Sequence, residues 1–126
     1  MEFHYTSKPT ILLLVKGQPH EAKLAQIAYG IEEEGIPFQR ILPEKTANLV
    51  SLAHQAALQS QLLVGIACDE QDTVLHYRNL PEEKFVYRIR DYTAASDKEL
   101  RLFGSNAARL VKGVPFRKSP ALEVSF

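Results

Sequence analysis

The chain has 126 residues, which is enough for one domain with a hydrophobic core and too few for two independent cores. Fifteen basic residues balance fifteen acidic ones, so no net charge draws the chain toward nucleic acid or an anionic membrane surface. The longest apolar runs, at 11–15 and 62–68, are too short to span a bilayer, and the first eight residues lack the pattern of a secretory signal.

The first part of the chain alternates predicted strands and helices. The continuous apolar run Ile11–Val15 predicts a strand that is covered on both faces. A helix is predicted to follow, with Pro19 in its first turn and Gly35 as its stop signal. Ile36–Leu42 then predicts a short second strand.

The middle of the chain predicts one further helix and three strands. Thr46 or Asn48 could cap the helix, which has an apolar inner face. Leu62–Cys68 predicts another buried strand. Thr73–Arg78 and Phe85–Arg90 alternate more clearly and predict strands nearer an edge of the sheet.

The last predicted helix has the clearest boundaries. Ser96 and Glu99 form a capping box at its start, and Gly113 ends it. Gly104 lies inside the helix, where it is unfavourable by about 1 kcal/mol against alanine, so we expect close packing against another backbone. The tail at 117–126 shows no periodicity and is predicted to be loose.

Helices that separate strands indicate an α/β fold. We therefore predict one three-layer domain over residues 1–126, with an ordered core at about 9–116. Its central sheet should be mostly parallel, with helices on both faces.

The loop after the first strand matches neither common phosphate-binding pattern. Residues 16–20, KGQPH, fit neither G-x-G-x-x-G nor G-x-x-x-x-G-K-[ST], and Pro19 lacks a backbone N–H that a phosphate would need. We therefore expect no nucleotide binding by this chain alone.

Cys68 ends a predicted strand, where a nucleophile could lie. Asp69 and Glu70 follow it, and nearby carboxylates would raise a thiol pKa, so we interpret Cys68 as a packing residue. As the only cysteine it excludes an internal disulfide and fits the reducing cytoplasm. The histidines show no metal-ligand spacing and are interpreted as structural: His4, His20, His54 and His76.

Three consecutive glutamates, residues 32–34, fall where the first helix ends. The helix dipole disfavours negative charge there, and the nearest candidate for a compensating cation is Arg40. Helical geometry places Glu33 on the side of Tyr29 and Gly30, away from the apolar stripe. Such a carboxylate could complete the coordination of a hard cation held by another chain. From the residues alone, a solvated acidic turn remains the favoured interpretation.

Four stretches resemble the small subunits of diol and glycerol dehydratase reactivases, in the same order and at similar spacing. They are GIEEEGIPF at 30–38, LLVGIACD at 62–69, HYRNLP at 76–81 and NAARLVKGVPF at 106–116. The resemblance covers roughly Ile11 to Phe116. It implies a fold similar to the medium subunit of the dehydratase itself. Within that span the sequence departs from familiar members at Phe85–Phe103, as it does in the tail after Phe116, so the choice between diol and glycerol dehydratase as client stays open.

The resemblance implies a subunit without catalytic activity. Family members pair with a large subunit that has an actin-like ATPase core, in a two-plus-two heterotetramer. The complex serves an adenosylcobalamin-dependent dehydratase: the small subunit leaves, the large subunit docks on the inactivated enzyme, and damaged cobalamin is released. ATP and ADP would bind only to the large subunit, and the complex could reside in a bacterial microcompartment.

The resemblance also assigns one metal ligand. In the family, the second glutamate of the signature is a ligand to a divalent metal ion in the large subunit; that position is Glu33 here, so a shared site for Mg²⁺ or Ca²⁺ is expected. Glu32 and Glu34 are left as charge context. The alternative is a free-standing α/β enzyme or ligand-binding domain that uses the strand-end residues Lys16, Cys68 and Asp69.

Overall fold

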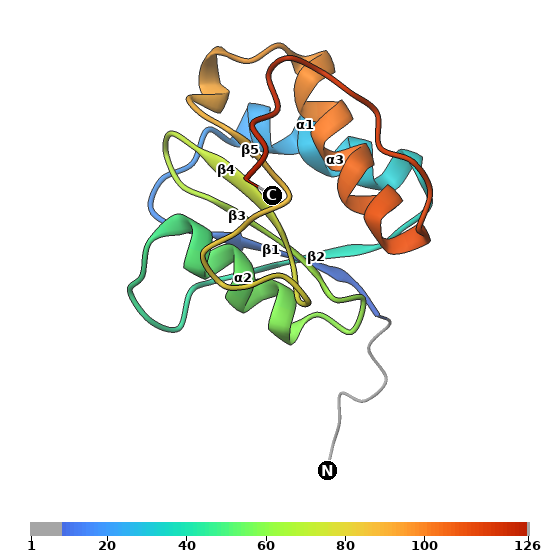
Figure 1. Cartoon of the computed structure of the whole chain (residues 1–126). Coiled ribbons are helices and arrows are strands. Elements are labelled where there is room, and N and C mark those ends of the chain that lie inside the picture. Colours follow the sequence, from blue (N-terminus) through green and yellow to red (C-terminus); the bar gives the residue numbers. More distant parts are fainter. Residues whose placement is uncertain (1–8, 126) are drawn as a thin grey trace.

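The computed structural model describes residues 9–125, which form a five-stranded sheet between two layers of helices (Figure 1). In chain order the elements are β1 (Ile11–Val15), α1 (Glu21–Glu33), β2 (Phe38–Ile41), α2 (Leu49–Gln59), β3 (Val64–Cys68), β4 (Thr73–Tyr77), β5 (Tyr87–Ile89), a short 3-10 helix (Tyr92–Ala94) and α3 (Asp97–Lys112). The strands lie in the order β2-β1-β3-β4-β5.

The connections between strands determine the direction of each pairing. β1 pairs in parallel with both β2 and β3, because α1 and α2 carry the chain back across the sheet. Connections without a helix, residues 69–72 and 78–86, join β3 to β4 and β4 to β5, and both of these pairs are antiparallel. The predicted α/β domain with helices on both faces is confirmed, and its sheet is mixed, with a parallel half and an antiparallel half.

The position of β1 in the middle of the fold explains why its sequence is apolar at every position. Ile11, Leu13 and Val15 pack into the core cluster that α1 and α3 cover. Leu12 and Leu14 point to the other face and pack against α2. Both faces of the strand are therefore buried, as expected for a parallel strand between helical layers.

The helices α1 and α3 lie side by side with their backbones in contact. A Cβ atom on Gly104 would lie 2.0 Å from the carbonyl oxygen of Ile27, and one on Gly30 would lie 2.0 Å from that of Arg101. Only glycine fits at such a distance. The close packing predicted for Gly104 is confirmed, and Gly30 contributes the matching contact from α1.

α1 begins two residues after Pro19, and α2 begins directly after Asn48, one of its two predicted caps. α1 begins at Glu21, and His20 caps it by accepting a hydrogen bond through Nδ1 from the backbone N–H of Lys23 at 3.4 Å. Pro19 thus precedes the cap, and its predicted place inside the first turn was wrong. Asn48 caps α2 by accepting from the N–H of Ser51 at 2.9 Å.

α3 has the boundaries that its sequence indicates. Ser96 and Glu99 form the complete capping box, and Gly113 ends the helix in the left-handed conformation. At 16 residues α3 remains shorter than a bilayer span. In the described part of the chain, no helix is long and apolar enough to cross a membrane.

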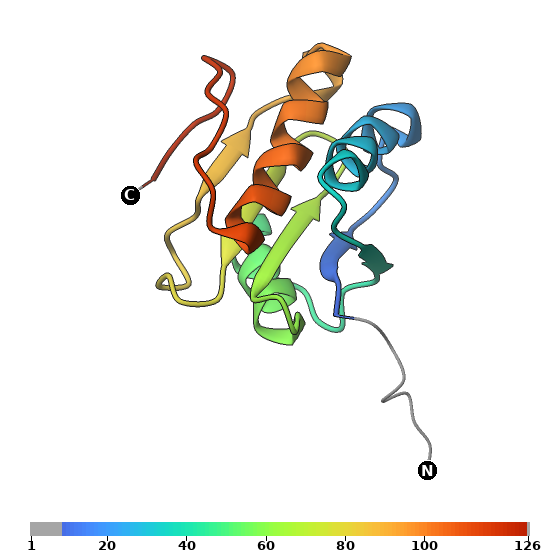
Figure 2. The same ribbon diagram turned by 90° about the vertical axis from the view of Figure 1, so that its right-hand side faces the viewer.

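The segment after α3 differs from the loose tail that was expected. Residues 117–125 return along the free edge of β5 (Figure 2). Glu123 and Arg88 exchange two backbone hydrogen bonds of 2.8 and 2.9 Å, and the Glu123 carboxylate accepts from Arg90 at 2.8 Å. Strand-edge pairing requires no sequence periodicity, which is why composition alone did not predict it.

Candidate partner-binding site

Glu33 is the last residue of α1, and its side chain is exposed. The core side of α1 is formed by Leu24, Ile27 and Ile31, so the helical turn directs Glu33 away from the sheet. Within residues 9–125, its carboxylate takes part in no hydrogen bond or ion pair. The structure thus places Glu33 on the surface, as its position in the helix predicts.

A hollow of about 300 Å³ opens beside this carboxylate. Its lining combines α1, α3 and the segment after α3, and the residues are Glu33, Lys98, Arg101, Leu102 and Arg117. Leu102 is buried, whereas the four charged residues are exposed. We call this surface the Glu33 hollow. Three cationic side chains and one carboxylate line this hollow, a grouping that the sequence did not reveal.

Glu33 can supply only one of the several ligands that a metal ion needs. Among the described residues, no group of three or more histidine, cysteine, aspartate or glutamate side chains could hold a metal ion. Mg²⁺ and Ca²⁺ need several oxygen ligands. A divalent cation at this carboxylate would therefore take its other ligands from a second chain or from water.

Glu34 was predicted to be only charge context for Glu33, but the structure gives it a structural role. Its carboxylate accepts hydrogen bonds from Lys112 at 2.8 Å, Ser105 at 2.6 Å and Arg109 at 3.1 Å, all on α3. These bonds hold the pKa of Glu34 at about 2. Charge context was therefore too weak a description, because Glu34 is the ionic link between α1 and α3.

Two predictions about the acidic turn, residues 32–34, were wrong. Arg40 does not compensate it, since its guanidinium pairs with Glu21 at 2.8 Å. Gly30 does not face outward beside Tyr29, because it is buried against the backbone of α3. Tyr29 is exposed, and Glu32 is exposed without an ion-pair partner in the described chain. Only Glu33 thus combines exposure with a place in a hollow.

Two members of the alternative catalytic set, Cys68 and Asp69, are engaged in local structure. Cys68 is fully buried beside Thr73, at 2.9 Å from Sγ to Oγ1, and burial raises the pKa of its thiol to about 12. The Asp69 carboxylate accepts from the N–H groups of Gln71 and Asp72 and closes a turn. The interpretation of Cys68 as a packing residue is thus supported, and it offers no thiolate nucleophile.

The histidines in the described range are structural by their contacts. His20 caps α1, and His76 is fully buried, with hydrogen bonds to the backbone of Tyr77 and Glu82. The His54 ring lies 4.5 Å from that of His76. His4 lies outside the described residues.

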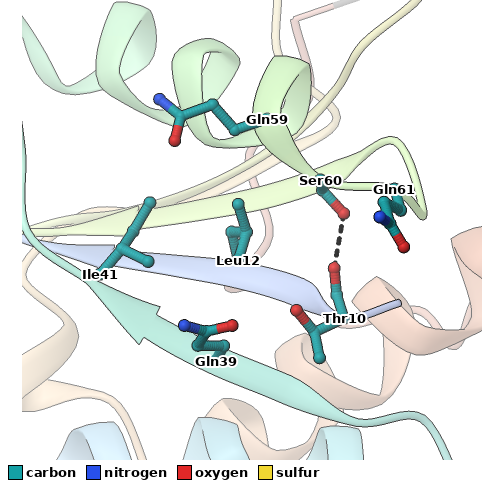
Figure 3. Close-up of a pocket in the computed structure, with 7 residues that line it drawn as sticks. All are labelled: Thr10, Leu12, Gln39, Ile41, Gln59, Ser60 and Gln61. Atoms are coloured by element: carbon teal, nitrogen blue, oxygen red, sulfur yellow. Dashed lines mark hydrogen bonds between the residues drawn. The ribbon is translucent and has the colours of Figure 1, made fainter. Parts of the chain in front are cut away.

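A second hollow, of about 270 Å³, lies on the α2 side of the sheet near the start of β1 (Figure 3). Its lining residues are Thr10, Leu12, Gln39, Ile41, Gln59, Ser60 and Gln61. The Ser60 hydroxyl donates to the carbonyl oxygen of Thr10 at 2.6 Å. The lining carries no charged or imidazole group, so it supplies neither a general base nor an anion-binding cation.

Comparison with known proteins identifies the family. The dehydratase medium subunit family matches residues 8–117. The diol dehydratase-reactivating factor small subunit of Klebsiella michiganensis is 47% identical over 92 residues, which are 73% of this chain and 71% of that protein. The propanediol dehydratase-reactivating factor small subunit of Salmonella typhimurium is 46% identical over 92 residues, 73% of this chain and 77% of that protein. This chain belongs to the family of dehydratase-reactivating factor small subunits.

The family's solved structures agree with the fold described above. The structure of a diol dehydratase-reactivating factor complexed with ADP and Mg²⁺ matches with a TM-score of 0.79 and 41% identity, over 89% of this chain and 100% of that chain. The resemblance found in the four sequence stretches is therefore confirmed at the level of family and fold.

Proposed function

We propose that this chain is the small, non-catalytic subunit of a reactivase for an adenosylcobalamin-dependent diol or glycerol dehydratase. The observation that carries the proposal is the 46–47% identity to reactivating factor small subunits across about three quarters of the chain. The chain's own features fit a binding role: the strand-end thiol is buried, and the hollow beside Glu33 is rich in charge.

In this proposal the chemistry of ATP belongs to a large subunit. The two chains form a two-plus-two complex, and the small subunit leaves it so that the large subunit can dock on the inactivated dehydratase. Cycling driven by ATP then releases damaged cobalamin. The loop at residues 16–20 fits this division, because it does not have a phosphate-binding pattern. ADP and Mg²⁺ accompany the solved reactivating factor that matches this fold.

Glu33 is the contact that we assign to the metal in this complex. Its carboxylate is exposed and without an internal partner in the described chain, so it is available as one oxygen ligand to Mg²⁺ or Ca²⁺ held by the large subunit. Glu34 cannot take this role without breaking three hydrogen bonds to α3. The metal thus ties the affinity of the complex to one side chain of this chain.

The test compares two neighbouring substitutions. Glu33→Gln keeps the shape and removes the charge, so affinity for the purified large subunit in Mg²⁺ should fall at least about tenfold. Chelator should weaken the parent and leave the variant nearly unchanged. Glu32→Gln is the matched control and should bind like the parent. Equal binding of Glu33→Gln and the parent in Mg²⁺ and in chelator would refute the shared-metal assignment.

A further inference from the structure

The cationic side chains of the Glu33 hollow form no ion pair with any other described residue of the chain. Elsewhere in residues 9–125 some basic side chains have an acidic partner, as in the Arg88–Asp72, Arg90–Glu123 and Lys23–Asp97 pairs, and others such as Lys45 stand alone. Within residues 9–125, none of the hollow's three cations (Lys98, Arg101 and Arg117) lies within ion-pair distance of a carboxylate. The chain as a whole has no net charge, so this local excess of positive charge is a property of the hollow.

Arg101 is held in place by a neutral group. Its Nε donates to the side-chain oxygen of Gln26 on α1 at 2.8 Å. An amide fixes the direction of the guanidinium without neutralising it. The two terminal nitrogens have no hydrogen-bond partner in the described chain, and they are the pair that binds a carboxylate through two parallel bonds.

Arg117 is held in place by a buried side chain. Asn106 is fully buried in α3, and its amide donates to the carbonyl oxygen of Arg117 and accepts from its N–H, each at 2.7 Å. Both polar atoms of a buried amide are thus used to fix the backbone of one exposed arginine. The bonds fix the point where Arg117 leaves the backbone beside the hollow, and within residues 9–125 its guanidinium has no hydrogen-bond or ion-pair partner.

We infer that the Glu33 hollow binds an acidic segment of the large subunit, with at least two carboxylates, of which one pairs with Arg101. The inference rests on the proposed function, because it takes the large subunit as the partner. Three cations against one carboxylate give the hollow a surplus of positive charge that an acidic segment complements. The pairing would hold whether or not a metal ion is bound at Glu33.

The experiment measures affinity for the purified large subunit at about 0.05 M and about 0.5 M salt, where screening differs strongly. Arg101→Glu should lower the affinity at least about tenfold at low salt and flatten its dependence on salt. Lys45→Glu makes the same change of charge on an exposed residue in the loop between β2 and α2, so it should bind like the parent.

A second variant separates the inference from misfolding. Gln26→Glu gives Arg101 an internal ion-pair partner, so the thermal stability of the isolated chain should hold or rise while affinity falls about threefold or more. Both variants should still bind the large subunit more weakly than the parent when chelator has removed divalent metal ions. If the parent binds the large subunit and both Arg101→Glu and Gln26→Glu bind it as tightly as the parent does, the inference is wrong and the proposed function stands. If the parent does not bind the large subunit, both are wrong.

Discussion

Replacing Glu34 by glutamine removes one negative charge from the junction of α1 and α3 and keeps the shape of the side chain. The carboxylate contacts Ser105, Arg109 and Lys112, which lie more than 70 residues away in sequence. It also lies at the C-terminal end of α1, where the helix dipole opposes a negative charge. The two effects predict opposite results, and their magnitudes decide between them.

The ionic contacts outweigh the dipole. A folded-state pKa of about 2 against an ordinary 4.5 corresponds to about 3 kcal/mol, at about 1.4 kcal/mol for each pKa unit. The side chain is 15% exposed, so solvent screening lowers this value, and the helix dipole offsets up to about 1 kcal/mol more. We expect Glu34→Gln to lower the free energy of unfolding by about 1–2 kcal/mol at pH 7.

The stability lost in Glu34→Gln should be smaller at low pH than at neutral pH. The folded state lowers the pKa of Glu34, so its stabilisation is fully present above pH 4.5 and disappears as the pH falls toward about 2. Urea unfolding of parent and variant at pH 7 and pH 3 measures this, and the gap between them should shrink by more than half at pH 3. Glu32→Gln, which changes an exposed residue, should stay within about 0.5 kcal/mol of the parent. A Glu34→Gln variant as stable as the parent at pH 7 would refute the reasoning.

Two further predictions concern packing. Cys68→Ala should lower the free energy of unfolding by about 1–2 kcal/mol, and the native thiol should react with an alkylating reagent only as fast as the protein unfolds; fast labelling of folded protein would contradict its burial. Gly104→Ala should destabilise by about 3 kcal/mol or more, because its Cβ would meet the carbonyl oxygen of Ile27, whereas Gly113→Ala, at a left-handed position with open space around it, should cost about 1 kcal/mol. Thermal unfolding of both glycine variants checks this, and equal losses would show that α1 and α3 are not in backbone contact.

The sequence predicted most of what local physics controls. Unbroken apolar runs gave β1 and β3, because a strand covered on both faces has no polar positions. The capping box at Ser96 marked the start of α3, since that signal depends on residues three positions apart. The exposure of Glu33 followed from the turn angle of a helix.

The rest depended on contacts between residues far apart in the chain. Glu34 could not be told from its neighbours, because Arg109 and Lys112 reach it from the last helix. The cations around Glu33 come from α3 and from the segment that follows it, so no spacing in the sequence groups them. Gly30 was placed on the outer face for the same reason: the approach of α3 was not visible.

The matching glycine contacts between α1 and α3 have a consequence for association. The Glu33 hollow is lined by residues of both helices, and backbones in direct contact restrict any shift of the two helices against each other. A surface that is already rigid loses little conformational entropy when a partner covers it, so its charges are preorganised for binding. In the subunit exchange proposed above, the same rigidity would let the chain leave the complex as a folded unit and rejoin it without any refolding step.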